Sequence, residues 1–386
     1  MASSVGAVDS RAQSAAKVVH YNAGDRPAEQ WRVVNAPLLT IGGENGDGPT
    51  AFANVAGVAR LSDGSVVVAD AGAQELRVFD ATGRFVRRMG RRGRGPGEFD
   101  GLRDLAHVGD TIAASDRSGR LQLFAPDGAL LRSVARPTYR TPSVAFQLGW
   151  FSDWSLLAAG FPPPTDTTAS RQLAPMLLVR IDPTGREQVL DTVPSFEVAR
   201  TGGGPPMPVQ FAATYRAVTV GNRYCGGHQR AFVITCFDRD GRALVRTERA
   251  VPSAPLPDEA REYFRTTTLR ANASLPASAQ AQLREMIRLT QFADHGSAFG
   301  VLRGATTGEL WVAPFDYRAS MINQLLVPTS DVPQRWSVLG GDGRWLAEVT
   351  LPARFALLDA GRDWVAGVQR DADDVESVVV LRLQRP

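Results

Sequence analysis

Five segments of this 386-residue chain share one form: an apolar run in which side chains alternate, a tight turn rich in Gly and Asp, and a restart. The turn glycines are Gly83, Gly128, Gly185, Gly241 and Gly343, which lie 45, 57, 56 and 102 positions apart. Four-stranded repeat units recur every roughly 40 to 50 residues, and loop insertions lengthen that period. The spacing therefore predicts one all-β repeat architecture along the whole chain.

The clearest repeat unit covers residues 57–90. Its four expected strands are 57–61, 65–70, 75–79 and 84–89. The inner strands are apolar and β-branched, as a sheet buried on both faces requires. Glycine supplies positive φ at the turns, and a neighbouring Asp bonds to the local backbone. Further units are expected at 102–135, 145–193, 211–250 and 298–350.

The C-terminal end supplies only three strands of a sixth unit. Its fourth strand is expected near residues 33–42, because Leu39–Gly42 leads into Gly-rich residues just as Arg88–Gly90 does. Pairing the two chain ends would close a ring and remove exposed strand edges. The sequence thus predicts a six-bladed β-propeller over residues 31–386, whose last blade is closed by an N-terminal strand. Residues 1–30, rich in Ala, Ser and polar groups, are expected to form a disordered tail.

Four long insertions interrupt the repeats, at 160–172, 194–210, 251–297 and 314–335. In a propeller, the links between blades and the loops between second and third strands open on one face, and the remaining turns open on the other. The strand assignment places all four insertions on the first face. Because binding and catalytic residues concentrate on loops, this face is the expected functional surface.

The largest insertion, 251–297, lies between blades 4 and 5 and is expected to be helical. Residues 257–264 have an acidic first turn, and 278–289 space apolar side chains for one helix face. Two helices here would either form a lid over the central channel or pack flat on the disc.

The segment Met89–Phe99, with its Gly-rich link ending in Gly97-Glu98-Phe99, resembles the NHL repeat. The chain as a whole is similar to bacterial six-bladed propellers of that broad class. Proteins of the class include scaffolds, protein or RNA binders, and lyases or lactonases, so the resemblance implies a fold more than an activity. It also favours an extracytoplasmic or periplasmic location.

Charge gives little support to nucleic-acid or membrane binding. The formal net charge is only +3, and no apolar run approaches the roughly 18 residues of a spanning helix. The N-terminus lacks the pattern of an export signal. Five arginines gather in one loop, but no aromatic residues for base stacking accompany them. They are Arg87, Arg88, Arg91, Arg92 and Arg94.

The two cysteines, Cys225 and Cys236, could form a disulfide only if their hairpin turned between Arg230 and Ala231. Gly226-Gly227 instead suggests a turn several residues earlier. That turn would separate the sulfurs too far for a bridge. Two free thiols are therefore expected.

The first functional hypothesis is a non-catalytic binding or scaffold module, a monomer without cofactor, that holds a peptide, carbohydrate or partner protein on its loop-decorated face. Aromatic and arginine side chains dominate binding hot spots. The candidate contacts are Arg103, Trp150, Trp154, Tyr215, His228, Tyr317 and Arg318. The tryptophans could equally be packing residues within strands.

The alternative is a metal-assisted hydrolase or lyase, lactonase-like, acting at the channel mouth. Asn54, Asp100 and Asp104 would converge with His228 or His295 on a divalent ion such as calcium. No glutamate joins them, which departs from the lactonase pattern. No Gly-x-Ser-x-Gly nucleophile motif is present either.

Overall fold

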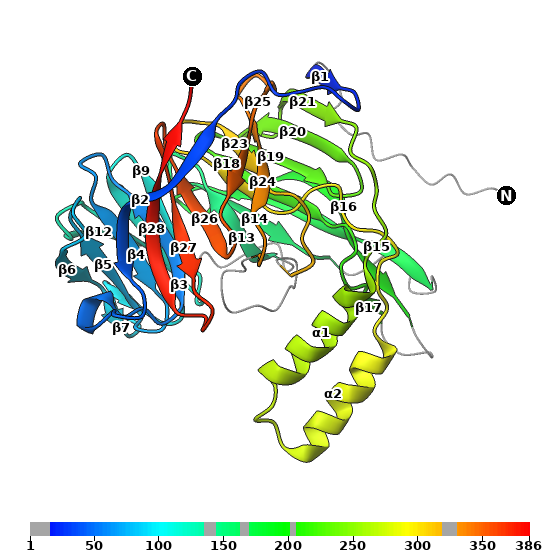
Figure 1. The fold of residues 1–386 in the computed structure, drawn as a ribbon, viewed down its shortest axis with the longest axis horizontal. Helices are drawn as coiled ribbons and strands as arrows, with labels where there is room; N and C mark the ends of the chain where they lie inside the picture. Colours follow the sequence, from blue (N-terminus) through cyan, green and yellow to red (C-terminus); the bar gives the residue numbers. More distant parts are fainter. Residues whose placement is uncertain (1–15, 135–143, 163–169, 201–205, 319–329) are drawn as a thin grey trace.

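The strands form six antiparallel sheets, each packed against its two neighbours around a common axis (Figure 1). The computed structural model describes residues 16–134, 144–162, 170–200, 206–318 and 330–386. Blade 1 consists of β3 (Val55–Arg60), β4 (Val66–Asp70), β5 (Glu75–Phe79) and β6 (Phe85–Met89). Blade 2 consists of β9 (Leu102–Val108), β10 (Thr111–Asp116), β11 (Leu121–Phe124) and β12 (Leu130–Val134). Blade 3 consists of β13 (Val144–Trp150), β14 (Leu156–Gly160), β15 (Arg171–Ile181), β16 (Glu187–Ala199) and β17 (Met207–Pro208). Two short strands, β7 (Arg91–Arg92) and β8 (Glu98–Phe99), pair in the link between blades 1 and 2.

The remaining blades have the same order from inside to outside. Blade 4 consists of β18 (Tyr215–Val220), β19 (Arg223–His228), β20 (Phe232–Asp238) and β21 (Ala243–Arg249). Blade 5 consists of β22 (Leu302–Gly304), β23 (Leu310–Val312), β24 (Gln334–Leu339) and β25 (Trp345–Leu351). Blade 6 consists of β26 (Phe355–Ala360), β27 (Trp364–Arg370), β28 (Glu376–Gln384) and β2 (Arg32–Gly42). The predicted six-bladed all-β fold is confirmed.

The repeated turn is an Asp-anchored loop. In blade 1, Asp80 Oδ1 accepts the backbone N–H of Thr82 at 2.9 Å and of Arg84 at 3.0 Å, while Gly83 has a φ of 84°. Asp182 and Asp238 accept equivalent bonds in blades 3 and 4. The Asp carboxylate accepts backbone N–H groups that have no strand partner in the turn, and Gly takes the left-handed conformation. The same turn therefore forms at each repeat that has these residues.

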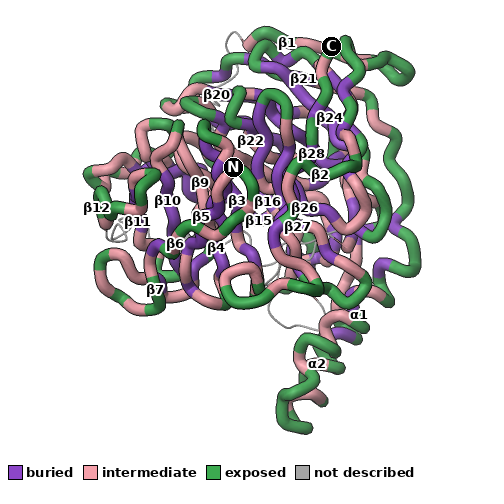
Figure 2. The backbone as a smooth tube through the Cα atoms, turned by 60° about the vertical axis from the view of Figure 1, so that its left-hand side comes forward, coloured by how far each residue is buried: buried purple, intermediate pink, exposed green. Residues whose placement is uncertain are grey.

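The ring closes between the two ends of the chain. β2 pairs with β28 along its length, with Thr40 opposite Val379 and Ile41 opposite Val378. Ile41 is buried in the layer between blades 6 and 1. Buried apolar layers of this kind fill the contact between each pair of neighbouring blades, as the concentration of buried residues in the strands of Figure 2 shows.

The expectation of a disordered tail over residues 1–30 is wrong for part of that range. Residues 17–21 form β1 (Lys17–Tyr21), which adds in parallel to the outer edge of β21. Tyr21 packs edge-on against Trp345 at 5.7 Å, and its hydroxyl accepts the Trp345 backbone N–H. Residues 1–15 lie outside the described residues.

The expectation of two free thiols is also wrong. Cys225 in β19 lies directly opposite Cys236 in β20, and the two are joined by a disulfide with Cα atoms 3.9 Å apart. Gly226 and Gly227 lie within β19 instead of forming a turn. A Cβ on Gly227 would sit 2.0 Å from the Val233 carbonyl oxygen, so these glycines permit a close backbone approach.

The 251–297 insertion folds as two helices, α1 (Asp258–Ala271) and α2 (Ala277–Leu289). They form a hairpin that projects from the propeller and neither caps its axis nor lies flat on it (Figures 1 and 2). Its base is buried in an apolar cluster made of Phe211, Leu256, Ala260, Phe264, Ile287 and Tyr317. Neither helix is long and apolar enough to cross a bilayer, and the described residues contain no other α-helix.

Candidate functional site

A groove of about 450 Å³ lies between blades 4 and 5, beneath the base of the helical hairpin. This volume is within the range of small-molecule pockets, roughly 300–1,000 Å³. We refer to it as the insertion groove. Its walls are the ends of β20, β21, β23 and β24, the links 251–257 and 296–298, and the loop residues 313–318 and 332. Segments from two of the predicted insertions therefore form one surface.

A fixed cation forms the floor of the insertion groove. The Arg249 guanidinium lies 4.4 Å from the ring centres of both Phe232 and Trp345, and it donates a 2.7 Å hydrogen bond to Ser337 Oγ. Burial lowers the pKa of Arg249, and the nearby Glu348 carboxylate opposes that shift. Because two aromatic rings and Ser337 contact the guanidinium, its orientation is set before any ligand arrives.

Two more arginines line the groove nearer to solvent. The Arg318 guanidinium stacks on Tyr317 at 4.5 Å, and its backbone N–H is fixed by Asp316 Oδ1 at 2.9 Å. The Arg335 side chain is 71% exposed and lies 3.7 Å from Glu348. The Ser297 hydroxyl, also in the lining, is buried and has no hydrogen-bond partner among the described residues. The groove thus combines positive charge with an unused polar group.

Tyr317 and Arg318 are the two predicted contact residues that line this groove. Tyr317 is itself buried, with its ring 6.0 Å from Phe211 and 5.6 Å from Tyr263. Burial raises the pKa of Tyr317. It therefore anchors the hairpin as well as supporting Arg318, whereas Arg318 is the more accessible group.

The other predicted aromatic contacts are packing residues. Trp150 and Trp154 fill the layer between blades 2 and 3, together with Leu121 and Leu123. Tyr215 packs between blades 3 and 4 against Gly226, and burial raises its pKa. None of these rings lines the insertion groove, and neither does Arg103, which is exposed on β9.

His228 is held by two backbone groups. Its Nε2 lies 2.9 Å from the Ser195 carbonyl oxygen, and its Nδ1 accepts the Arg230 N–H at 3.3 Å. This arrangement suits a neutral imidazole that donates from Nε2. Burial lowers the His228 pKa, consistent with that form. The side chain is positioned structurally and does not line the insertion groove.

The residues proposed for a metal are engaged separately. Asp100 pairs with Arg94 at 2.9 Å, while Asn54 takes a left-handed conformation and its carbonyl accepts the Ala71 N–H. Asp104 lies at the propeller axis beside Arg303 and Trp150. In the part of the chain that the structure describes, no three His, Cys, Asp or Glu side chains are grouped as metal ligands would be.

The five arginines of β6 and the loop after it also contact the protein. Arg88 pairs with Glu75, Arg91 with Glu98 and Arg94 with Asp100. Arg87 and Arg92 donate to backbone carbonyls of Pro126 and Gly72. These bonds fix the link between blades 1 and 2.

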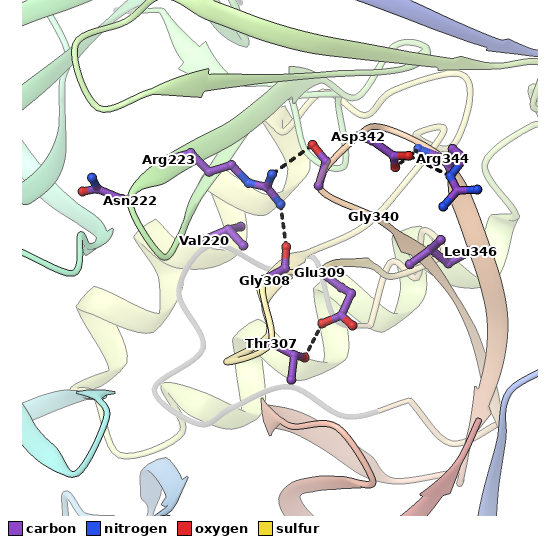
Figure 3. Close-up of a pocket in the computed structure, with 11 residues that line it drawn as sticks. Val220, Asn222, Arg223, Thr307, Gly308, Glu309, Gly340, Asp342, Arg344 and Leu346 are labelled. Atoms are coloured by element: carbon purple, nitrogen blue, oxygen red, sulfur yellow. Dashed lines mark hydrogen bonds and ion pairs between the residues drawn. The ribbon is translucent and has the colours of Figure 1, made fainter. Parts of the chain in front are cut away.

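A second cavity, of about 660 Å³, lies between blades 4 and 5 on the opposite, turn-bearing face (Figure 3). Its charged side chains are satisfied internally. Arg223 donates to the carbonyls of Gly308 and Gly341 at 2.5 and 3.0 Å, and Asp342 pairs with Arg344. Glu309 accepts bonds from Thr307 and Arg385. These groups join the two blades, so this cavity is a weaker candidate for a ligand.

The architecture and the repeated turns define a six-bladed β-propeller. The sequence of residues 54–116 matches the profile of a family described as a 6-bladed beta-propeller (DUF5128). No curated protein matches the sequence.

Solved structures of the same fold cover nearly the whole chain. A Bacteroides fragilis protein, described in its name as exported, superposes with a TM-score of 0.50 at 14% identity, covering 96% of this chain and 100% of its own. A DUF4221 family member from Bacteroides vulgatus gives 0.51 at 10% identity, covering 93% and 99%. The virginiamycin B lyase of Staphylococcus aureus gives 0.41 at 8% identity, covering 92% and 99%. At these identities the likeness concerns the fold alone.

Proposed function

We propose that this propeller is a non-catalytic binding module and that its insertion groove holds an acidic segment of a peptide or partner protein. The observation that carries the proposal is the set of three arginines, Arg249, Arg318 and Arg335, in a lining whose described residues include one carboxylate, that of Asp316. Two carboxylates outside the lining contact them at long range: Glu348 lies 3.8 Å from Arg249 and 3.7 Å from Arg335, and Asp331 lies 3.7 Å from Arg318. Because these contacts are long, the guanidinium groups remain able to bind a carboxylate-bearing ligand through paired hydrogen bonds.

The shape of the groove supports a peptide. Four prolines stand in its lining, at positions 252, 255, 257 and 314. Proline restricts φ and therefore limits the backbone entropy that binding would cost. Aromatic surface from Phe232 and Phe315 provides apolar contact beside the charges. A short extended segment with an acidic side chain matches this combination.

The disulfide supports action outside the cytoplasm. Bridges such as Cys225–Cys236 persist in oxidising compartments and are rare in the cytosol. The similar Bacteroides fragilis protein, named as exported, agrees with this placement.

Selection of random peptides on the immobilised full chain tests the proposal, followed by calorimetric titration of the selected sequences. A matched pair of steric variants locates the site. Ala254→Trp introduces a large side chain into the insertion groove, and Asn222→Trp does the same in the turn-face cavity. Both positions are exposed, so either variant should fold.

The proposal expects acidic peptides whose binding is lost in Ala254→Trp, retained in Asn222→Trp and weakened by salt or by Arg335→Glu. Binding that survives Ala254→Trp, or selected peptides without acidic residues, would contradict it. Turnover of a lactone or ester that EDTA abolishes would instead favour the metal-assisted hydrolase.

A further inference from the structure

The innermost strands of five blades bring polar groups together at the propeller axis. Asp104 comes from β9, Trp150 from β13, Arg216 from β18 and Arg303 from β22, and β26 contributes the Leu357 carbonyl. Blades 2 and 5 stand opposite each other in a ring of six. The electrostatic interaction of Asp104 with Arg303 therefore reaches across the axis.

Arg303 has partners on two sides. Its Nε donates to the Leu357 carbonyl oxygen at 3.2 Å, and Asp104 supplies the opposing charge. Burial lowers the pKa of Arg303, and the Asp104 carboxylate opposes this shift. Burial raises the pKa of Asp104, and the Trp150 side chain lowers it against this larger effect. No carboxylate oxygen of Asp104 lies within 4 Å of an Arg303 nitrogen, and both residues are only partly buried, so their charges interact at longer range than in a salt bridge.

Arg216 is different. Burial lowers its pKa, and the positive charge of Arg303 lowers it further. Its Nε is buried and has no hydrogen-bond partner among the described residues. The Asp104 carboxylate acts on Arg303, whereas Arg216 forms no ion pair with any carboxylate among the described residues.

A buried charge without a partner is costly, and proteins supply a counter-ion or hydrogen-bond acceptor where one persists. We propose that the propeller axis binds a small oxyanion, such as phosphate, sulfate or a carboxylate, between Arg216 and Arg303. The planar guanidinium fork suits the paired oxygens of all three groups. This site is separate from the insertion groove, whose arginines come from other elements.

Isothermal titration of the purified full chain with inorganic phosphate, sulfate and acetate tests the proposal, with sodium chloride at matched ionic strength as reference. Thermal unfolding measured in the same buffers gives a second readout, because an anion that binds only the folded state raises Tm. The variants are Arg216→Gln, Arg303→Gln and Asp104→Asn. Arg284→Gln, which removes an exposed arginine of α2, is the matched control.

At least one of the three oxyanions should bind the wild type and Arg284→Gln with equal affinity. Its affinity should fall about 10-fold or more in Arg216→Gln, because losing a hydrogen bond to a charged group costs at least that much in binding. Asp104→Asn should increase the affinity, because it removes the competing carboxylate. If Arg216→Gln does not fold, the other two variants still test the proposal, because Asp104→Asn should raise the affinity for the oxyanion and Arg303→Gln should lower it.

An equal rise in Tm with chloride, equal affinities in wild type and Arg216→Gln, or no binding of any of the three oxyanions would overturn the proposal. Peptide binding at the groove should be unaffected by Arg216→Gln, which keeps this test independent of the proposed function.

Discussion

The Cys225–Cys236 bridge links directly opposed positions on β19 and β20 near the middle of blade 4. We predict that reduction lowers the free energy of unfolding by about 2–3 kcal/mol, as expected for opening a loop of this length. Denaturant unfolding with and without a reducing agent measures the change. The double variant Cys225→Ala, Cys236→Ala should show no response to reductant, and an unchanged midpoint in the wild type would contradict the prediction.

His107 should make stability depend on pH. Its Nε2 lies 3.2 Å from Asp359 Oδ2 and its Nδ1 lies 2.8 Å from the Gly109 carbonyl oxygen. Burial lowers the His107 pKa, but the hydrogen bond and charge of Asp359 outweigh burial and leave the pKa raised. A raised folded pKa adds stability below the unfolded value of about 6.5, and this contribution is lost as pH rises through the folded pKa.

Denaturant unfolding between acid and alkaline pH tests this prediction in wild type and His107→Gln. The variant should lose that portion of the pH dependence. His228 works in the opposite direction: its lowered pKa makes stability fall as pH drops below about 6.5. His228→Gln should therefore flatten the acid side, and identical profiles in all three proteins would refute the assignment.

The two N-terminal strands have different roles. β1 adds to the outer edge of blade 4, whereas β2 completes blade 6 and closes the ring. A chain that starts at Gly24 should stay folded with a lowered Tm, because it loses the contact of Tyr21 with Trp345. A chain that starts at Gly43 should not form a soluble folded monomer, because β28 becomes an exposed edge.

Circular dichroism, thermal unfolding and size-exclusion chromatography distinguish the two truncated chains. Cooperative unfolding of the chain that starts at Gly43 would mean that β2 is dispensable for ring closure.

Local pattern accounts for what the sequence reveals about these elements. Side-chain alternation and Asp-Gly turns are local signals that span only a few residues. They predict the strand 57–61, which lies close to the observed β3, and the closing strand 33–42, which corresponds to β2. Gly226-Gly227 misleads because glycine marks close backbone approach as well as turns. The sequence does not predict β1, because five residues within a polar segment are too few to show a clear alternation of apolar and polar side chains.

The polar cluster at the axis was only partly predictable. Asp104 and Trp150 could be selected from the sequence, but their partners Arg216 and Arg303 could not. Their meeting depends on the ring that brings blades 2 to 6 around one axis, and no local spacing encodes it. The only available signal was the position of each arginine within the first strand of its blade.

The whole molecule is asymmetric in its two faces. Tight Asp-Gly turns occupy one face, and the helical hairpin and residues 313–318 after β23 lie on the other, where they contribute to the insertion groove. A rigid scaffold that carries its variable segments on one side is the usual arrangement of a binding protein. The account's central claim is that this face, through the insertion groove, is where the protein recognises its ligand.

Hydrogen–deuterium exchange of the full chain, with and without a peptide selected on it, tests that claim most directly. We predict slower exchange in residues 251–257, 296–298 and 313–318 when peptide is bound, with no change in 306–309 or 340–344 on the turn-bearing face. Protection of the turn-bearing segments, with the groove segments unchanged, would contradict the account.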